Sequence, residues 1–250
     1  MNEGALGGRS SAIIGGAVFC MVLCINTQLR RIERLSQISS WNLTRLALVA
    51  LPVLSALWLA VGVGVIGALS VDYSHVSEFM SALGASGAPL ANWANYAVFI
   101  PAELWLLLFL ATLAVHLPYS RSKWFFVAAL SAYALLLILL AILPCDAGCH
   151  IENENDAPET SVHILHMTIA AIAYPIAFIG MLPLSLSAPS NTYLNGLTLP
   201  VTAVGFGLIC AIVLVPDAQG LFQRLMEALI YIQLIFIGWY ASSLPVSAGQ

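Results

Sequence analysis

The amino-acid sequence predicts an all-α membrane protein, a polytopic bundle of six transmembrane helices with a possible seventh at the N-terminus. Two observations carry this prediction. Hydrophobic residues make up 60% of the 250-residue chain and charged residues only 8%, whereas about a quarter of an ordinary soluble protein is charged. The charged residues also collect in short segments, and long stretches between them carry none, as expected where no water solvates the chain.

Six segments are long and apolar enough to cross the bilayer, for which a helix needs roughly 20 apolar residues. They are Arg45–Val71, Asn95–Leu117, Trp124–Leu143, His163–Leu186, Leu197–Val215 and Leu221–Trp239. Together they define a membrane domain over residues 42–244, which is followed by a short tail over residues 245–250. Glycines in the first and fifth segments favour close helix packing, and prolines in several segments favour kinks.

The N-terminal segment, residues 1–41, leaves three interpretations open. Ser11–Ile25 is apolar for only about 15 residues, which is short for a membrane span. An extra helix is the favoured interpretation. A cleaved signal peptide lacks a suitable small-x-small cleavage site, and a translation start at Met21 is the third alternative.

Lysine and arginine in short loops predict the orientation, because these residues resist translocation. Only Arg9 and Arg224 fall on the predicted outer side. The other basic residues fall on the inner side: Arg30, Arg31, Arg34, Arg45, Arg121 and Lys123. We therefore expect the C-terminus to be cytoplasmic and the loops 72–93, 145–161 and 216–220 to be extracytoplasmic.

The first outer loop contains Asp72, His75 and Glu78 at three-residue spacing, which places them on one face if the segment is helical. The remaining pattern is an apolar stripe made of Val76, Phe79, Met80 and Leu83. The pattern predicts an amphipathic helix that lies on the membrane or covers the mouth of the bundle. Alternatively, its polar face supplies catalytic or metal-binding groups.

The second outer loop begins with Cys145 and Cys149, four residues apart in a turn that contains glycine. On the oxidising side of a membrane, such a pair most simply forms a disulfide. A thiolate metal site is the alternative. It is disfavoured because zinc sites prefer a two-residue spacing and a second ligand pair, which the other cysteines are poorly placed to provide.

Two histidines follow at the outer end of the fourth apolar segment. His163 and His166 are three residues apart, so both imidazoles lie on nearly the same side of a helix. With Asp72 or Asp146 within reach, they would form a catalytic site that holds a metal and activates water. Ordinary interfacial hydrogen bonding is the alternative. The sequence identifies neither the metal nor any other cofactor.

Glu103 is an acidic residue inside the second apolar segment, shortly after Pro101. An ionised carboxylate at the bilayer centre costs roughly 2.5 to 3.5 kcal/mol on insertion scales. We therefore expect Glu103 to be neutral, paired or turned toward a wet cavity, and to have a functional role. Arg224 is the expected partner, unless it pairs with Glu227 three residues further on.

Several short motifs resemble a known family. They are Tyr73–Ala85 (YSHVSEFMSALGA), Pro144-Cys145-Asp146, His166, Gly220 and Gln223-Arg224. Over residues 42–244 this combination resembles the bacterial domain-of-unknown-function family nine hundred and ninety-eight, and the family is similar to Frag-like eukaryotic lipid-remodelling membrane proteins. The resemblance implies a six-helix domain in the bacterial inner membrane, with an outer-face cluster of Ser77, Ser81, Asp146, His166 and Arg224. It implies no established activity.

Three functional hypotheses follow. The leading one is lipid handling, in which an outer-face pocket binds the headgroup of a membrane lipid; its expected ligand-binding residues are Glu103, Arg224, His75, Ser77 and Ser81, with His166 beside them. A metal-dependent hydrolase or transferase would instead use His163, His166, Asp72 and Asp146. A non-catalytic assembly subunit is the third.

Two further classes are disfavoured by the sequence. A haem carrier needs two histidines at matching depth on different helices, and His75, His116 and His166 do not pair in this way. Nucleic acid is not an expected partner, because the chain has no basic stripe or aromatic-interleaved patch.

Overall fold

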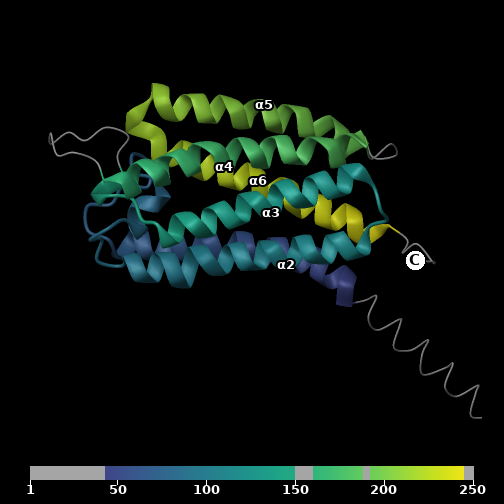
Figure 1. Cartoon of the computed structure of the whole chain (residues 1–250), viewed down its shortest axis with the longest axis horizontal. Coiled ribbons are helices and arrows are strands. Elements are labelled where there is room, and N and C mark those ends of the chain that lie inside the picture. Colours follow the sequence, from purple (N-terminus) through teal and green to yellow (C-terminus); the bar gives the residue numbers. More distant parts are fainter. Residues whose placement is uncertain (1–42, 150–159, 188–191, 245–250) are drawn as a thin grey trace, which may run out of the picture. The chain divides into compact units, whose positions relative to one another are not determined.

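The computed structural model describes residues 43–149, 160–187 and 192–244 (Figure 1). Almost all of the described elements belong to one compact unit, Arg45–Gln250. Every regular element in these three ranges is helical. The predicted all-α class is therefore confirmed.

Six helices are long and apolar enough to cross a membrane, as predicted. The first is Leu43–Leu69. The π-helix η2 (Trp93–Phe99) runs into α2 (Ile100–His116), and the others are α3 (Arg121–Ile142), α4 (Ser161–Leu186), α5 (Thr192–Leu214) and α6 (Gln219–Ser243). Three short 3-10 helices lie between them: η1 (Met80–Gly84), η3 (Ala147–Cys149) and η4 (Pro216–Ala218). The possible seventh helix at Ser11–Ile25 lies outside the described residues.

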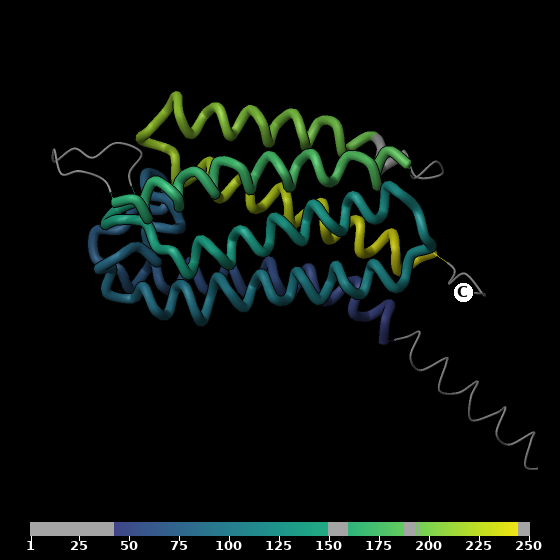
Figure 2. The backbone as a smooth tube through the Cα atoms, in the orientation of Figure 1, coloured from purple at the N-terminus to yellow at the C-terminus, as the bar shows by residue number. Residues whose placement is uncertain are grey.

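The helices lie side by side, and α3 packs against α2 and α4 while α5 packs against α4 and α6 (Figures 1 and 2). Residues 70–92, 143–149 and 215–218 gather at one end, which we call the loop end. The opposite end, with the α2–α3 turn, is called the turn end. Because lipid tails are as apolar as the core, close packing rather than water exclusion holds such helices together.

Pro101 explains why the second span begins with a π-helix. Proline has no N–H and its ring displaces the carbonyl four residues earlier, which here belongs to Ala97. The helix widens at this point, and the indole Nε1 of Trp58 donates to Ala97 O at 2.9 Å. A carbonyl that would be unpaired in the membrane is thereby satisfied by the first helix.

The prediction of an amphipathic helix over Asp72–Gly84 is wrong. Only Met80–Gly84 is helical, as the 3-10 helix η1. Asp72 has a φ of 63°, which does not fit a regular right-handed helix. Side chains take up the backbone groups instead: Glu78 Oε2 accepts from Ser74 N at 2.7 Å, and Ser74 Oγ accepts from Ser77 N at 3.3 Å. Such local bonds compete with a helical ladder.

Candidate functional site at the loop end

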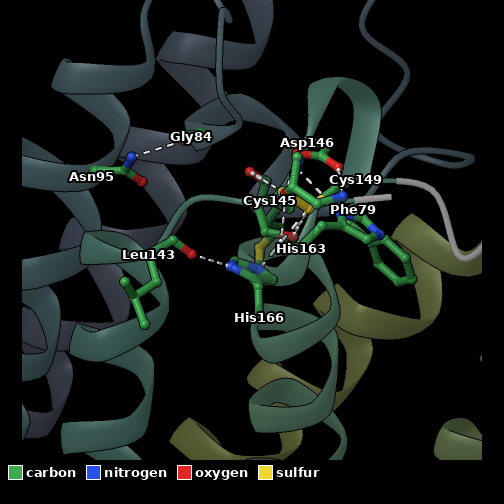
Figure 3. Close-up of a disulfide and its surroundings, with 12 residues drawn as sticks. Phe79, Gly84, Asn95, Leu143, Cys145, Asp146, Cys149, His163 and His166 are labelled. Atoms are coloured by element: carbon green, nitrogen blue, oxygen red, sulfur yellow. Dashed lines mark hydrogen bonds between the residues drawn. A yellow bond between two sulfur atoms is a disulfide. The ribbon is translucent and has the colours of Figure 1, made fainter. Parts of the chain in front are cut away.

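A disulfide joins Cys145 and Cys149 and closes the loop that contains η3, which packs against η1 (Figure 3). Their Cα atoms are 5.3 Å apart and both side chains are fully buried. Gly148, with a φ of 80°, permits the tight turn between them. Ser81 of η1 contacts this pair, with its Oγ 3.2 Å from Cys149 Sγ. The disulfide predicted from the spacing is confirmed.

His166 is buried beneath the disulfide (Figure 3). Its Nδ1 lies 2.7 Å from Leu143 O, and since a carbonyl can only accept, Nδ1 carries the proton. In the neutral ring Nε2 is then an acceptor, and it lies 3.9 Å from Cys149 Sγ. The imidazole is thus fixed in one tautomer and one orientation.

Asp146 and His163 lie at the N-terminal end of α4. Both carboxylate oxygens of Asp146 accept from Thr160, from its N–H at 2.9 Å and from its hydroxyl at 2.7 Å. Thr160 Oγ1 caps His163 N at 3.1 Å, and His163 Nδ1 accepts from Asp146 N at 3.1 Å. The Thr160 backbone and hydroxyl bonds lower the pKa of Asp146. The structure therefore brings Asp146 and His163 together as a helix cap.

The predicted metal set is not assembled in the described residues. Asp72 is exposed on the first loop and does not belong to any described group of close metal-ligand atoms. The group with metal-ligand atoms close together is Cys145, Cys149 and His166, all within 4.8 Å of one another. Two of these donors are sulfur atoms of the disulfide, which have no thiolate to offer a metal.

A small polar cavity of about 60 Å³ lies in the loop-end half of the bundle. Its polar lining is drawn from η1, α2, α4 and α6, and consists of Ser81, Glu103, His166, Tyr174, Gln223 and Glu227. Apolar side chains, among them Leu59 and Met80, close the remainder. A volume of this size exceeds that of a single water molecule.

Glu227 is buried and receives two phenolic hydrogen bonds. Tyr133 donates to Oε2 at 2.8 Å and Tyr174 donates to Oε1 at 2.9 Å. Gln223 Nε2 donates to the Tyr174 oxygen at 3.2 Å, while its own Oε1 accepts from Met80 N at 2.7 Å. Three helices and η1 therefore share one hydrogen-bond network around this carboxylate.

Glu103 faces the same cavity from α2 but lacks such support. Its side chain is 2% exposed, and Oε2 has no hydrogen-bond partner within the described part of the chain. The Tyr231 hydroxyl interacts with the Glu103 side chain and also lies 2.9 Å from Ser55 Oγ. The predicted exposure of Glu103 to a polar cavity is consistent with this geometry.

Arg224 has no carboxylate among its contacts within the described part of the chain. Nη1 donates to the carbonyls of Glu78 at 3.1 Å and Gly220 at 2.8 Å. Nη2 donates to the Tyr73 hydroxyl and to His75 Nδ1, the latter at 3.1 Å. Partial burial, and secondly the guanidinium, lower the pKa of His75. Arg224 thus engages four neutral acceptors instead of the predicted partners Glu103 or Glu227.

Two apolar grooves adjoin the polar cavity. One, of about 500 Å³, lies between the first helix and α6, and includes His75 and Arg224 in its lining. It shares Leu59, Met80 and Glu227 with the polar cavity. The other, of about 290 Å³, is lined mainly by α4, α5 and α6, and shares Ser81 and His166 with the cavity, among others. We call them the Arg224 groove and the α5 groove.

Comparison with known proteins assigns the chain to a family. Residues 53–240 match the family model described as "Protein of unknown function (DUF998)". The chain belongs to this family. No curated protein and no solved structure matches it. For this DUF998 member the family thus supplies a multi-pass membrane domain without an assigned activity, and function has to be argued from the site.

The predicted ligand-binding residues of this DUF998 member fall into two groups rather than one pocket. Glu103 and Ser81 line the polar cavity with His166, whereas His75 and Arg224 belong to the adjoining groove. Ser77 is half-buried in the turn before η1. Several network residues were not predicted from the sequence: Ser55, Tyr133, Tyr174, Tyr231, Gln223 and the role of Glu227. Their signal is a polar side chain inside an otherwise apolar span.

Proposed function

We propose that this DUF998 protein binds a phospholipid in the Arg224 groove, with the phosphate at Arg224 and His75 and an acyl chain along the groove. The single observation that carries this proposal is a groove of about 500 Å³ whose lining is mainly apolar, with His75 and Arg224 at one end and Glu227 and Tyr231 as its other polar members. An elongated apolar site with a few convergent polar groups is the usual form of a small-molecule site.

Charge complementarity supports a phosphate at Arg224. The four contacts of Arg224 are two carbonyls, a phenol and an imidazole, none of which neutralises the guanidinium. The Glu78 carboxylate is instead bonded to Ser74 N. An unneutralised cation inside a membrane-spanning segment is costly. A phosphate would remove this cost with charge-assisted hydrogen bonds.

The acyl chain is expected to lie against small side chains of the first helix. Ala56, Ala60 and Gly64 line the groove at four-residue spacing, so they form one face of that helix. On the other wall, Ala228, Ile232 and Ile235 of α6 follow one another at four- and three-residue spacing, which also places them on one helix face. This arrangement leaves room for a chain parallel to the two helices.

Groove filling tests the proposal. In phosphatidylglycerol nanodiscs, Ala60→Trp should weaken the apparent affinity for the lipid by about tenfold. The affinity is measured by native mass spectrometry from the lipid that the protein retains on extraction. Ala50→Trp is the matched control, because Ala50 is also exposed on the first helix but does not line this groove. Equal retention by the two variants would refute the proposal.

The headgroup contact is tested by changing the charge of Arg224. Arg224→Gln should lose about tenfold in retention, since a hydrogen bond to a charged group contributes roughly 1.5 to 3 kcal/mol. Arg224→Lys keeps the charge and should retain most of the binding, which separates the loss of charge from a general loss of structure. If Arg224→Gln protein remains folded and binds phosphatidylglycerol normally, the phosphate assignment is wrong.

We also propose that the loop end faces the extracytoplasmic side of the inner membrane. Among described residues, Arg45, Arg121 and Lys123 lie at the turn end and Arg224 at the loop end, a bias that favours a cytoplasmic turn end. In a background without the native free cysteines, an impermeant maleimide should label Ser86→Cys but not Tyr119→Cys in intact cells. The reverse pattern would invert the topology.

A further inference from the structure

The polar cavity presents two carboxylates to one small space. Glu103 enters it from α2 and Glu227 from α6, and both side chains are more than nine-tenths buried. Among the described residues, no lysine or arginine lines this cavity. The imidazole of His166 already uses its Nδ1 proton on Leu143 O. The described lining therefore contains two acidic side chains and no cation to balance them.

The hydrogen bonds around Glu227 indicate that it is a carboxylate. Tyr174 accepts from Gln223 Nε2, so its single hydroxyl proton is directed to Glu227 Oε1. Tyr133 lies 2.8 Å from the other oxygen. Both oxygens of Glu227 thus act as acceptors, and hydrogen bonds donated to both oxygens favour the ionised carboxylate over the acid. Glu227 thus brings negative charge to the cavity wall.

Glu103 supplies the second requirement, an acceptor without a donor. Its Oε2 is buried and unpartnered in the part of the chain that the structure describes, and its side chain lines the cavity. Leaving such an atom unsatisfied costs roughly 1 to 3 kcal/mol. A ligand that donates hydrogen bonds and carries positive charge would satisfy Glu103 and neutralise Glu227 together.

We infer that the polar cavity binds a primary ammonium group. An ammonium carries three N–H donors and one positive charge, which suits two carboxylates on separate helices. A quaternary ammonium has no N–H and is typically bound by aromatic faces. The remaining lining, including Leu59, Phe99 and Leu137, suits a methylene beside the nitrogen.

The lipid of the Arg224 groove is the favoured source of this ammonium, so the inference deepens the proposed function and rests on it. Leu59, Met80 and Glu227 line both the groove and the cavity, which makes the two spaces neighbours. A phospholipid with a phosphate at Arg224 and an amine a short spacer away would meet both. Phosphatidylethanolamine has this chemistry.

Lipid competition tests the inference in nanodiscs that contain equal parts of phosphatidylethanolamine and phosphatidylcholine. Wild-type protein should retain the ethanolamine lipid about tenfold more than the choline lipid by native mass spectrometry, and Glu103→Gln should abolish that preference. Glu103→Gln has nearly the same shape, so folding should be preserved. Asp217→Asn is the control, because Asp217 is an exposed acid at the loop end that does not line the cavity.

The outcomes separate this inference from the proposed function. Equal retention of the two lipids by wild type rules out the lipid as the source of the ammonium, and together with no stabilisation by ethylammonium it overturns the ammonium site. The proposed function stands in either case if phosphatidylglycerol retention still depends on Arg224. Loss of both dependences refutes both. Thermal stabilisation of the wild type by ethylammonium supports the site if tetramethylammonium gives none and the Glu103→Gln protein shows none. If this stabilisation is seen without any lipid preference, the ligand of the site is a free amine instead of a lipid. Stabilisation by sodium alone overturns the ammonium site.

Discussion

The two ends of the bundle use polar side chains in different ways. At the turn end they satisfy backbone carbonyls at helix ends: Lys123 Nζ donates to Ala114 O at 3.0 Å and Leu117 O at 2.8 Å, and His116 Nε2 lies 3.0 Å from Ala241 O. At the loop end they also border open space, as Arg224 joins α6 to residues 73–78 and lines the Arg224 groove. The turn-end contacts therefore stabilise helix ends, whereas the loop end combines charged side chains with a groove and a cavity that a ligand would use.

The largest expected effect concerns Glu227, which the loop-end network surrounds. Glu227→Leu removes the acceptor of two buried phenols, Tyr133 and Tyr174, and each orphaned hydroxyl costs roughly 1 to 3 kcal/mol. We expect a loss of about 4 kcal/mol in the free energy of unfolding in detergent micelles. Glu227→Gln keeps an acceptor and should lose about 1 kcal/mol. Similar losses for both variants would contradict the network.

Gly220 tests how closely the first loop docks on α6. A Cβ at this position would collide with the backbone carbonyl of Glu78, next to the bond from Leu221 N to Val76 O at 2.9 Å. Gly220→Ala should therefore reduce the stability by about 2 kcal/mol. Gly207→Ala, where open space surrounds the added methyl, is the control and should be neutral in the same thermal unfolding experiment.

Lys123 tests the contrast from the turn end. Lys123→Met removes a cation that satisfies two carbonyls at the C-terminus of α2, and should cost about 1 kcal/mol of stability. Phosphatidylglycerol retention should not change. A lipid-binding defect as large as that of Arg224→Gln would mean that the two ends are not functionally distinct.

The smallest expected effect is the pH dependence contributed by His75. Burial and Arg224 lower its pKa from the ordinary 6.5, so the ring is neutral in the free protein at pH 7. A bound phosphate favours the protonated ring and raises that pKa, so binding takes up a proton. Affinity for phosphatidylglycerol should therefore rise a few-fold as the pH falls from about 8 to about 5. His75→Gln should flatten this profile.

Hydropathy was sufficient to predict the six spans, because the bilayer restricts spanning segments to long apolar helices. The cost of burying an acid identified Glu103, and spacing identified the Cys145–Cys149 disulfide. The first loop could not be predicted in this way: the periodicity of Asp72, His75 and Glu78 fits a helix, but the Ser74 and Glu78 side chains bind the backbone in a turn. Local hydrogen bonding overrode the pattern there.

The division of the site into a groove and a cavity was not predictable from the sequence either. Tyr133 and Tyr174 meet Glu227 only because α3 and α4 pack together and turn their phenols toward α6. A single sequence contains no distance between residues on different helices. It does mark polar residues within apolar spans, and that signal would have selected most of the network.

The π-helix before Pro101 determines which way Glu103 points. A π-turn contains about one residue more than an α-turn, so everything after it is rotated by about 100° relative to a regular helix. Deleting one residue between 93 and 99 would return α2 to the ordinary register and swing the carboxylate around the helix axis, away from the cavity that it now lines. Pro101 thus fixes the rotation of α2 about its axis, and this rotation turns the Glu103 side chain toward the interior of the bundle rather than toward lipid.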